Sequence, residues 1–189
     1  MLNFVGYGRL DMLNWNSDGK YFDVIEPLEM DSSILNSPKF EGDSLRKVVL
    51  RKFPKDNYFV KALQKVVHNT RPKIDGKDRG HLIADSFQDY LLTKCEIEEH
   101  QREVHQFFGK GNNVNIRSQS PESNRNSTEL AGQLRFEQLV IDFLKKSENG
   151  EVYFEIEETT LSGKLGRRIF IKFLDSIRDD IHVFIPEER

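Results

Sequence analysis

The stretch GKDRGHLIADSF, residues 76–87, joins a charged run that contains glycine directly to an apolar run. The charged run supplies an acid, a cation able to bind phosphate, a flexible backbone position and a proton carrier. These four residues are Asp78, Arg79, Gly80 and His81. Together they suit the activation of water beside a phosphodiester. The same pattern also fits a charged turn that leads into a buried strand.

A second polar stretch, NIRSQSPESN, covers residues 115–124 and holds Gln119 between two asparagines. An amide oxygen is a neutral, hard ligand, and Mg²⁺ takes few protein ligands and keeps much of its water. One asparagine, phosphate oxygens and water could therefore form a catalytic magnesium site. The alternative is that these asparagines and serines only make turns.

The composition of the chain excludes several classes of protein. A length of 189 residues with 37% hydrophobic and 11% aromatic residues suits one ordinary globular domain. No apolar run is long enough to span a membrane, and the first twenty residues lack the pattern of a signal peptide. The single cysteine, Cys95, excludes an internal disulfide and a cysteine-rich zinc site.

The charge is unevenly distributed, although its formal total is only -3. Residues 46–79 contain eleven Lys and Arg against three Asp, so this segment is strongly basic and the remainder strongly acidic. Such asymmetry favours a basic face for an anionic partner. A solvated surface balanced by nearby acids is the alternative.

The periodicity of the sequence favours an α+β fold, with a mixed or antiparallel sheet and flanking helices. Residues 45–53, 152–158, 167–174 and 181–185 are expected to be strands, and the apolar run after His81 to begin as a strand. Residues 58–67 fit either a strand or a helix, residues 95–108 a helix, and residues 112–126 a loop. Residues 1–40 are expected to form an irregular or short-stranded N-terminal extension packed on a core of residues 41–189, within a single domain overall.

A further helix is predicted after Asn126. Asn126 would cap it and Glu129 would complete a capping box. Its apolar face would contain Phe136, Val140 and Leu144.

These motifs in combination resemble those of the DNA/RNA non-specific endonucleases, which are ββα-metal (His-Me finger) nucleases. The resemblance rests on DRGH, on the two asparagines at 115 and 124, and on Arg135-Phe136-Glu137 in the following helix. RPKIDGKDRGHLIA and GQLRFEQLV are similar to segments of the streptococcal DNA-entry type. The C-terminal strand–turn–strand is similar to the ends of bacterial nuclease toxin domains. The resemblance covers roughly residues 40–185.

The resemblance implies a role for each matching residue. His81 would be the general base, Asn124 the direct Mg²⁺ ligand, and Glu137 would contact the metal through water. Asn115 and Gln119 would support the metal site without binding the ion. Arg79 would face the phosphate, and Asp78 would order the end of the strand. Arg71, Lys73, Lys77 and Arg79 would contact the nucleic-acid backbone, although the lysines and Arg71 fit solvated charges equally well.

One geometric condition follows from the helical repeat. Asn124 and Glu137 would point about 140° apart on one unbroken helix. They can share a site only if Asn124 precedes that helix. Glu129 is the other candidate for the acid of the metal site, but we interpret it as a residue that stabilises the N-terminus of the helix.

The expected activity is Mg²⁺-dependent hydrolysis of DNA, and of RNA as a second substrate, with little sequence preference; Mn²⁺ is the alternative ion. A nucleic-acid-binding protein without turnover is one alternative. A toxin domain neutralised by an immunity protein is another. No membrane partner is expected. The protein would be cytoplasmic as expressed, or exported by a non-classical, toxin-type route.

Overall fold

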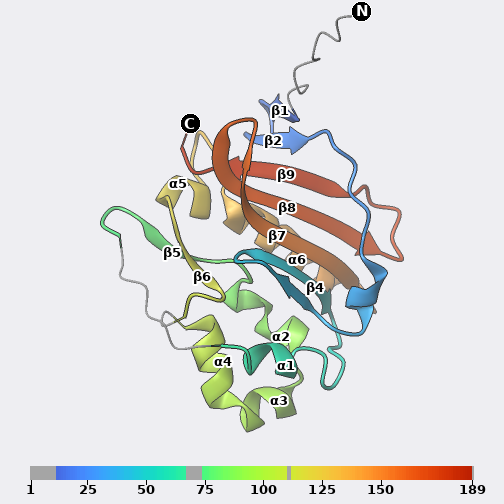
Figure 1. Cartoon of the computed structure of the whole chain (residues 1–189). Coiled ribbons are helices and arrows are strands. Elements are labelled where there is room, and N and C mark those ends of the chain that lie inside the picture. The colour runs from blue at the N-terminus through green and yellow to red at the C-terminus, as the bar shows by residue number, and fades with distance from the viewer. Residues whose placement is uncertain (1–11, 67–73, 110–111, 189) are drawn as a thin grey trace, which may run out of the picture.

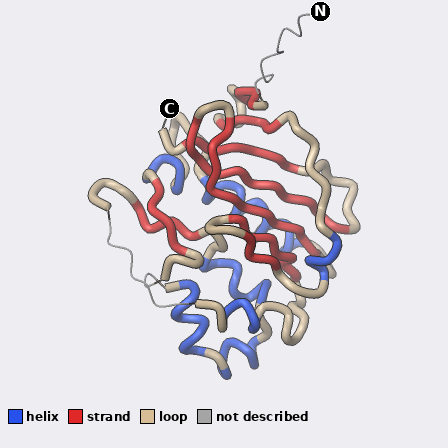
Figure 2. The backbone as a smooth tube through the Cα atoms, in the orientation of Figure 1, coloured by secondary structure: helices blue, strands red, loops and turns tan. Residues whose placement is uncertain are grey.

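The computed structural model describes residues 12–66, 74–109 and 112–188. Within these residues, seven strands form one antiparallel sheet and two form a small separate sheet (Figure 1, Figure 2). The large sheet contains, in spatial order, β1 (Leu13–Asn16), β2 (Tyr21–Val24), β9 (Ile181–Pro186), β8 (Lys164–Leu174), β7 (Glu151–Leu161), β4 (Leu45–Arg51) and β3 (Lys39–Glu41). The fold is therefore α+β with an antiparallel sheet, as the sequence predicts.

The longest strands form where the sequence alternates most regularly. β7 and β8 are a hairpin of two eleven-residue strands, joined by Ser162 and Gly163. Both turn residues have positive φ, 48° and 76°, as a two-residue hairpin turn requires. The strands predicted around residues 45–53, 152–158, 167–174 and 181–185 are confirmed.

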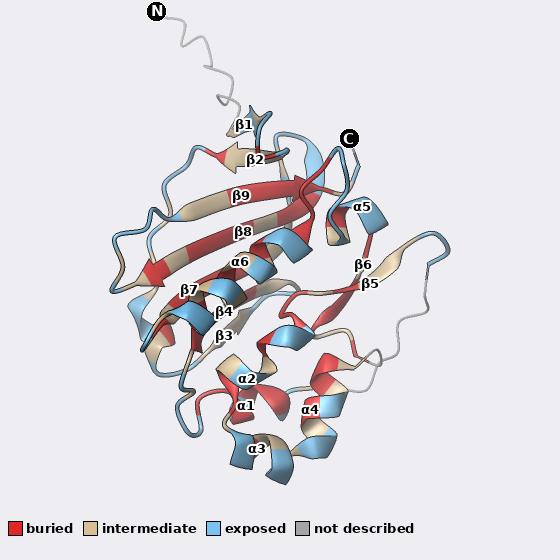
Figure 3. Cartoon of the chain, turned by 180° about the vertical axis from the view of Figure 1, so that it is seen from behind, coloured by how far each residue is buried: buried red, intermediate tan, exposed pale blue. Residues whose placement is uncertain are grey.

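Helix α6 (Gln133–Lys146) lies across one face of the large sheet (Figure 3). It buries Phe136, Val140 and Leu144, so the predicted apolar face is confirmed. The predicted start at Asn126 is wrong. The Ser127 hydroxyl accepts hydrogen bonds from the backbone N–H groups of residues 129 and 130, which closes a local turn where the capping box was expected.

The short helices of residues 60–108 pack beyond the end of the large sheet that β4 and β3 form (Figure 1). The helical segments other than α6 are η1 (Ser32–Leu35), α1 (Val60–Leu63), η2 (Asp85–Phe87), α2 (Gln88–Leu91), α3 (Lys94–Glu99), α4 (Gln101–Phe108) and α5 (Pro121–Asn124). The single helix predicted for residues 95–108 is two helices, because the backbone leaves helical geometry at His100 (φ −117°, ψ 32°). A capping box between Thr93 and Glu96 starts α3.

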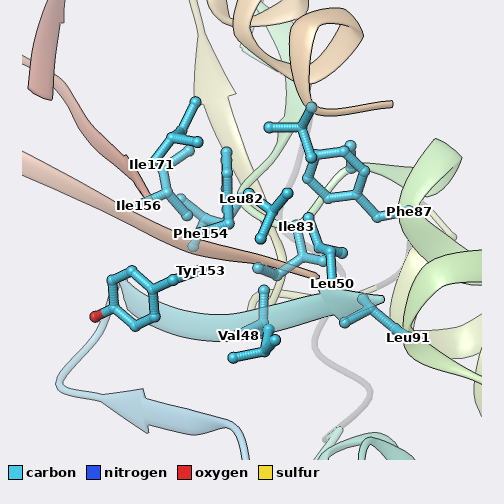
Figure 4. Close-up of a cluster of buried hydrophobic side chains, with 14 of the residues drawn as sticks. Val48, Leu50, Leu82, Ile83, Phe87, Leu91, Tyr153, Phe154, Ile156 and Ile171 are labelled. Atoms are coloured by element: carbon cyan, nitrogen blue, oxygen red, sulfur yellow. The ribbon is translucent and has the colours of Figure 1, made fainter. Parts of the chain in front are cut away.

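The small sheet pairs β5 (Asp78–His81) with β6 (Ile116–Gln119). The strand is thus DRGH itself, and the prediction that a strand begins with the apolar run after His81 is wrong. Leu82 and Ile83 instead leave the strand and enter the main core, beside side chains of β4 and β7 (Figure 4). Residues 112–126 are also not simply a loop, since they contain β6 and α5.

The N-terminal segment contributes strands to the large sheet. β2 pairs with β9, with Phe22 opposite Phe184. The expected boundary between residues 40 and 41 falls inside β3. Among the residues described, no helix has the length and apolar character needed to cross a bilayer.

Candidate active site

A cavity of about 310 Å³ lies where the end of β5 meets α5 and α6. Three of the residues that the sequence singles out line it: His81, Asn124 and Glu137. The other lining residues are Ala84, Asp85, Ser86, Arg125 and Leu134. Two antiparallel strands and a short helix, β5, β6 and α5, thus place the predicted base beside the predicted metal ligand, and α6 adds the carboxylate.

The ring of His81 is fixed by a backbone group. Its Nε2 lies 2.7 Å from the carbonyl oxygen of Phe108 at the end of α4. A carbonyl oxygen only accepts, so Nε2 must carry the proton. In the neutral ring the lone pair is then on Nδ1, which makes Nδ1 the nitrogen able to take a proton.

The side chain of Asn124 is oriented by Asp78. The Asn124 Nδ2 group donates to Asp78 Oδ2 at 2.9 Å. Arg125 donates to both oxygens of the same carboxylate, at 2.9 and 2.8 Å. Because a carboxylate accepts, the amide nitrogen of Asn124 faces Asp78 and the amide oxygen Oδ1 is left for another ligand. Asp78 therefore orders α5 and the residue after it.

Glu137 reaches the cavity from α6, one turn after Gln133. Gln133 Nε2 donates to Glu137 Oε1 at 2.7 Å. Burial raises the pKa of the Glu137 carboxyl, while the Gln133 hydrogen bond and the positive charge of Arg167 act in the opposite direction. Asn124 and Glu137 belong to two different helices, so the geometric conflict of a single helix does not arise.

Two buried donors hold the backbone of β5 from behind. Arg167 of β8 donates to the His81 carbonyl at 2.6 Å, and Gln133 Nε2 donates to the same oxygen at 2.7 Å. Arg167 also donates to Gln133 Oε1 at 2.6 Å. Arg167 is fully buried, and burial lowers its pKa to about 10. One hydrogen-bonded network therefore links the strand of the base to the helix of the carboxylate.

The sequence around Arg167 indicates that this arginine is buried. Arg167 shares its strand face with Ile169, Ile171 and Phe173, which are all buried. An arginine in such an apolar alternation must be satisfied inside the protein. Gln133 and Arg125, which the sequence analysis also missed, give no comparable sign.

Gly80 is not the flexible backbone position that the sequence suggests. It lies within the strand β5, and its φ is not positive. A Cβ at this position would collide with Gln119 Oε1 and lie 3.0 Å from the Arg167 guanidinium. Glycine is needed here because those two side chains occupy the space beside the strand.

Asn115 and Gln119 lie behind the cavity and do not line it. Asn115 is fully buried; its Oδ1 accepts from Ile83 N–H at 2.7 Å and its Nδ2 donates to Ile83 C=O at 2.9 Å. It thereby fixes the chain as it leaves His81. Gln119 is fully buried against Gly80 and donates weakly to Ser123 and Gln133.

Among the described residues of the basic segment 46–79, none lines the cavity. Lys77 pairs with Glu187 at 3.3 Å and lines a separate hollow, and Arg79 is not among the residues that line the cavity. Arg46 and Arg51, within the basic segment, are buried. Arg71 and Lys73 lie outside the described residues. Arg46 donates to the Val114 carbonyl, and Arg51 forms an ion pair with Glu151. These two arginines therefore do not contribute to the expected basic face.

The donors at the cavity fit a hard divalent cation. The amide oxygen of Asn124 and the carboxylates of Asp85 and Glu137 are oxygen donors around one space, and oxygen is the donor type that Mg²⁺ and Mn²⁺ share. Among the described residues, no group of three His, Cys, Asp and Glu is close enough to hold an ion directly. An ion here would be held by few protein ligands together with water.

Comparison with known proteins supports the architecture. No family model matches the chain. No curated protein matches it in sequence. Its structure is similar to the crystal structure of NucA from Streptococcus agalactiae with no metal bound, with a TM-score of 0.54 and 15% identity. The match covers 89% of this chain and 80% of the other. The chain therefore shares its fold with NucA from Streptococcus agalactiae.

Proposed function

We propose that this protein is a metal-dependent endonuclease of the ββα-metal type, which hydrolyses phosphodiester bonds in DNA and, as a second substrate, in RNA. The observation that supports it best is that His81, Asn124 and Glu137 line one cavity. The chain shares its fold with NucA from Streptococcus agalactiae, and its motifs resemble those of the streptococcal DNA-entry nucleases, which is consistent with this activity.

His81 is the proposed general base. Its Nε2–H is held by the Phe108 carbonyl, so Nδ1 takes a proton from the attacking water. The carbonyl of Phe108 also stabilises the imidazolium that results, because it accepts from the opposite side of the ring. The two donors on the His81 carbonyl fix the backbone from which the ring projects.

The proposed ion is Mg²⁺, with Mn²⁺ as the alternative, held by Asn124 Oδ1 and supported by Glu137 through water. When bound, it would neutralise the charge that develops on the phosphate and the leaving oxygen. Arg125 lies in the cavity and is exposed, so we assign to it the phosphate contact that the sequence suggested for Arg79.

The proposal is tested by incubating plasmid DNA, and separately RNA, with the purified protein in Mg²⁺, in Mn²⁺ and in EDTA. Cleavage is expected only with an ion. His81→Ala is expected to lower the rate by roughly 10²- to 10⁴-fold without changing the melting temperature. His100→Ala is the matched histidine control and is expected to keep the wild-type rate. Wild-type turnover in His81→Ala would exclude the assignment of the base, and no cleavage with either ion would exclude the nuclease.

A further inference from the structure

A second cavity, of about 640 Å³, adjoins the candidate active site on the other side of His81. It lies against the helices α2, α3 and α4, which pack beside the end of the β5–β6 sheet (Figure 3). Its lining residues are His81, Asp85, Gln88, Ile97, Gln101, Val104, His105, Phe108 and Gly109. His81 and Asp85 line both cavities, so a substrate held at His81 extends naturally into the second one.

The lining of the second cavity differs in chemistry from that of the first. None of the described residues that line it is Lys or Arg, and Asp85 carries a negative charge. A phosphate would meet no lysine or arginine among them. The lining instead combines three hydrogen-bonding side chains, Gln88, Gln101 and His105, with the apolar side chains of Ile97, Val104 and Phe108.

That combination suits a nucleobase. A base has flat apolar faces and an edge of donors and acceptors, and amide side chains pair with such edges through both their oxygen and their nitrogen. The volume falls within the range of small-molecule sites. Gln88 already donates to Asp85, whereas Gln101 and His105 are exposed at the rim and available to a ligand.

We propose that the second cavity binds the base of the nucleotide next to the phosphate that is cleaved. This inference rests on the proposed nuclease function and sharpens it. Backbone contacts at the first cavity would leave cleavage largely independent of sequence, while the second cavity would impose a base preference at one flanking position.

The test is to digest a randomised oligonucleotide, as single strand and as duplex, and to sequence the ends of the products. Wild-type protein is expected to show a base preference of about fivefold or more at one position beside the cut, the lower limit for a hydrogen-bonded contact to a base edge. Gln101→Trp, which fills the cavity from its rim, and His105→Ala are expected to reduce or change that preference. Gln138→Trp makes the same change as the first variant on an exposed position of α6 and is expected to leave the preference unchanged.

The outcomes separate this inference from the proposed function. Cleavage without a preference, or with a preference that neither cavity variant alters, would overturn the base site and leave the nuclease intact. A second readout does not need turnover: an oligonucleotide carrying 5-iodouracil is photo-crosslinked to the protein in EDTA. Crosslinks to Gln88 or within residues 97–109 would support the base site, and crosslinks confined to other segments would overturn it. Absence of cleavage with Mg²⁺ and Mn²⁺ would overturn the nuclease itself.

Discussion

β7 and β8 are eleven-residue strands that bury phenylalanine and isoleucine side chains. β5 and β6, in contrast, are four residues long and lie against buried polar side chains. A two-stranded sheet of this size is only marginally stable alone. Arg167 and Gln133 come from other elements and bind the His81 carbonyl, and Asn115, which directly precedes β6, binds the backbone of Ile83 just beyond β5. The large sheet is thus stabilised mainly by apolar packing, and the small one depends on specific hydrogen bonds.

The comparison is first tested in the apolar core. Phe154 of β7 is fully buried and its ring lies 5.2 Å from that of Phe87 (Figure 4). Phe154→Ala is expected to lower the free energy of unfolding by about 3–5 kcal/mol, measured by urea denaturation. The protein that remains folded is expected to cleave DNA normally. A large loss of activity per folded molecule would show that the two regions are not separable in this way.

The second test removes a polar support of the small sheet. Arg167→Met removes the donor that Arg167 supplies to the His81 carbonyl and to Gln133 Oε1, and leaves the latter with the 3.4 Å contact from Gln119. The change is expected to cost roughly 2–3 kcal/mol of stability. It is also expected to lower cleavage by about tenfold to a hundredfold, because one of the two donors that hold the backbone of His81 is lost. Arg168→Met is the matched control on the opposite strand face, where Arg168 pairs with Glu155 and Glu157. The control is expected to lose stability but not activity per folded molecule; equal losses of activity in both variants would contradict the comparison.

The third test adds a single methyl group to the small sheet. Gly80→Ala places a Cβ against the side chain of Gln119 and is expected to cost about 1–3 kcal/mol. Gln119→Ala removes that side chain, so the double variant is expected to be more stable than the sum of the two single changes predicts. A thermodynamic cycle by urea denaturation measures this coupling. Additive effects would show that Gln119 is not what requires glycine at position 80.

The smallest expected effect is a pH dependence in the large sheet. Burial lowers the pKa of His182, whose Nδ1 lies 2.9 Å from the Glu26 carbonyl and whose Nε2 is buried. The unfolded chain then binds the proton more readily, so stability falls as the pH drops through the ordinary histidine pKa of about 6.5. His182→Phe is expected to show a smaller fall between about pH 7.5 and about pH 5.5 in urea denaturation. If His182→Phe lost as much stability over this pH range as the wild type does, groups other than His182 would account for the pH dependence.

The same contrast explains how far the sequence could be interpreted. Alternation of apolar residues is a local property, so the strands of the large sheet and the apolar face of α6 were predictable from short windows. His81, Asn124 and Glu137 could be singled out because their motifs resemble those of a known nuclease family; the structure places the three around one cavity, and their roles stay predictions. The start of α6 was not, since Ser127 forms a turn that competes with the helix cap.

The supports of the site depend on contacts between distant parts of the chain. Nothing near Gln133 indicates that its amide will bond the His81 carbonyl. DRGH also appeared to be a turn, because a four-residue strand with one glycine and three polar residues has no apolar alternation. Gly80 is buried partly because the Arg167 side chain lies against it, and Arg167 follows it in the sequence by more than eighty positions.

The position of Arg167 also has a consequence for synthesis of the protein. A chain that has left the ribosome only as far as residue 160 already contains His81, Asn124 and Glu137. It still lacks β8, and with it Arg167, one of the two donors that hold the strand of His81. The nascent chain is therefore expected to carry every proposed catalytic group before it can cleave nucleic acid, so activity would begin only after β8 has paired with β7.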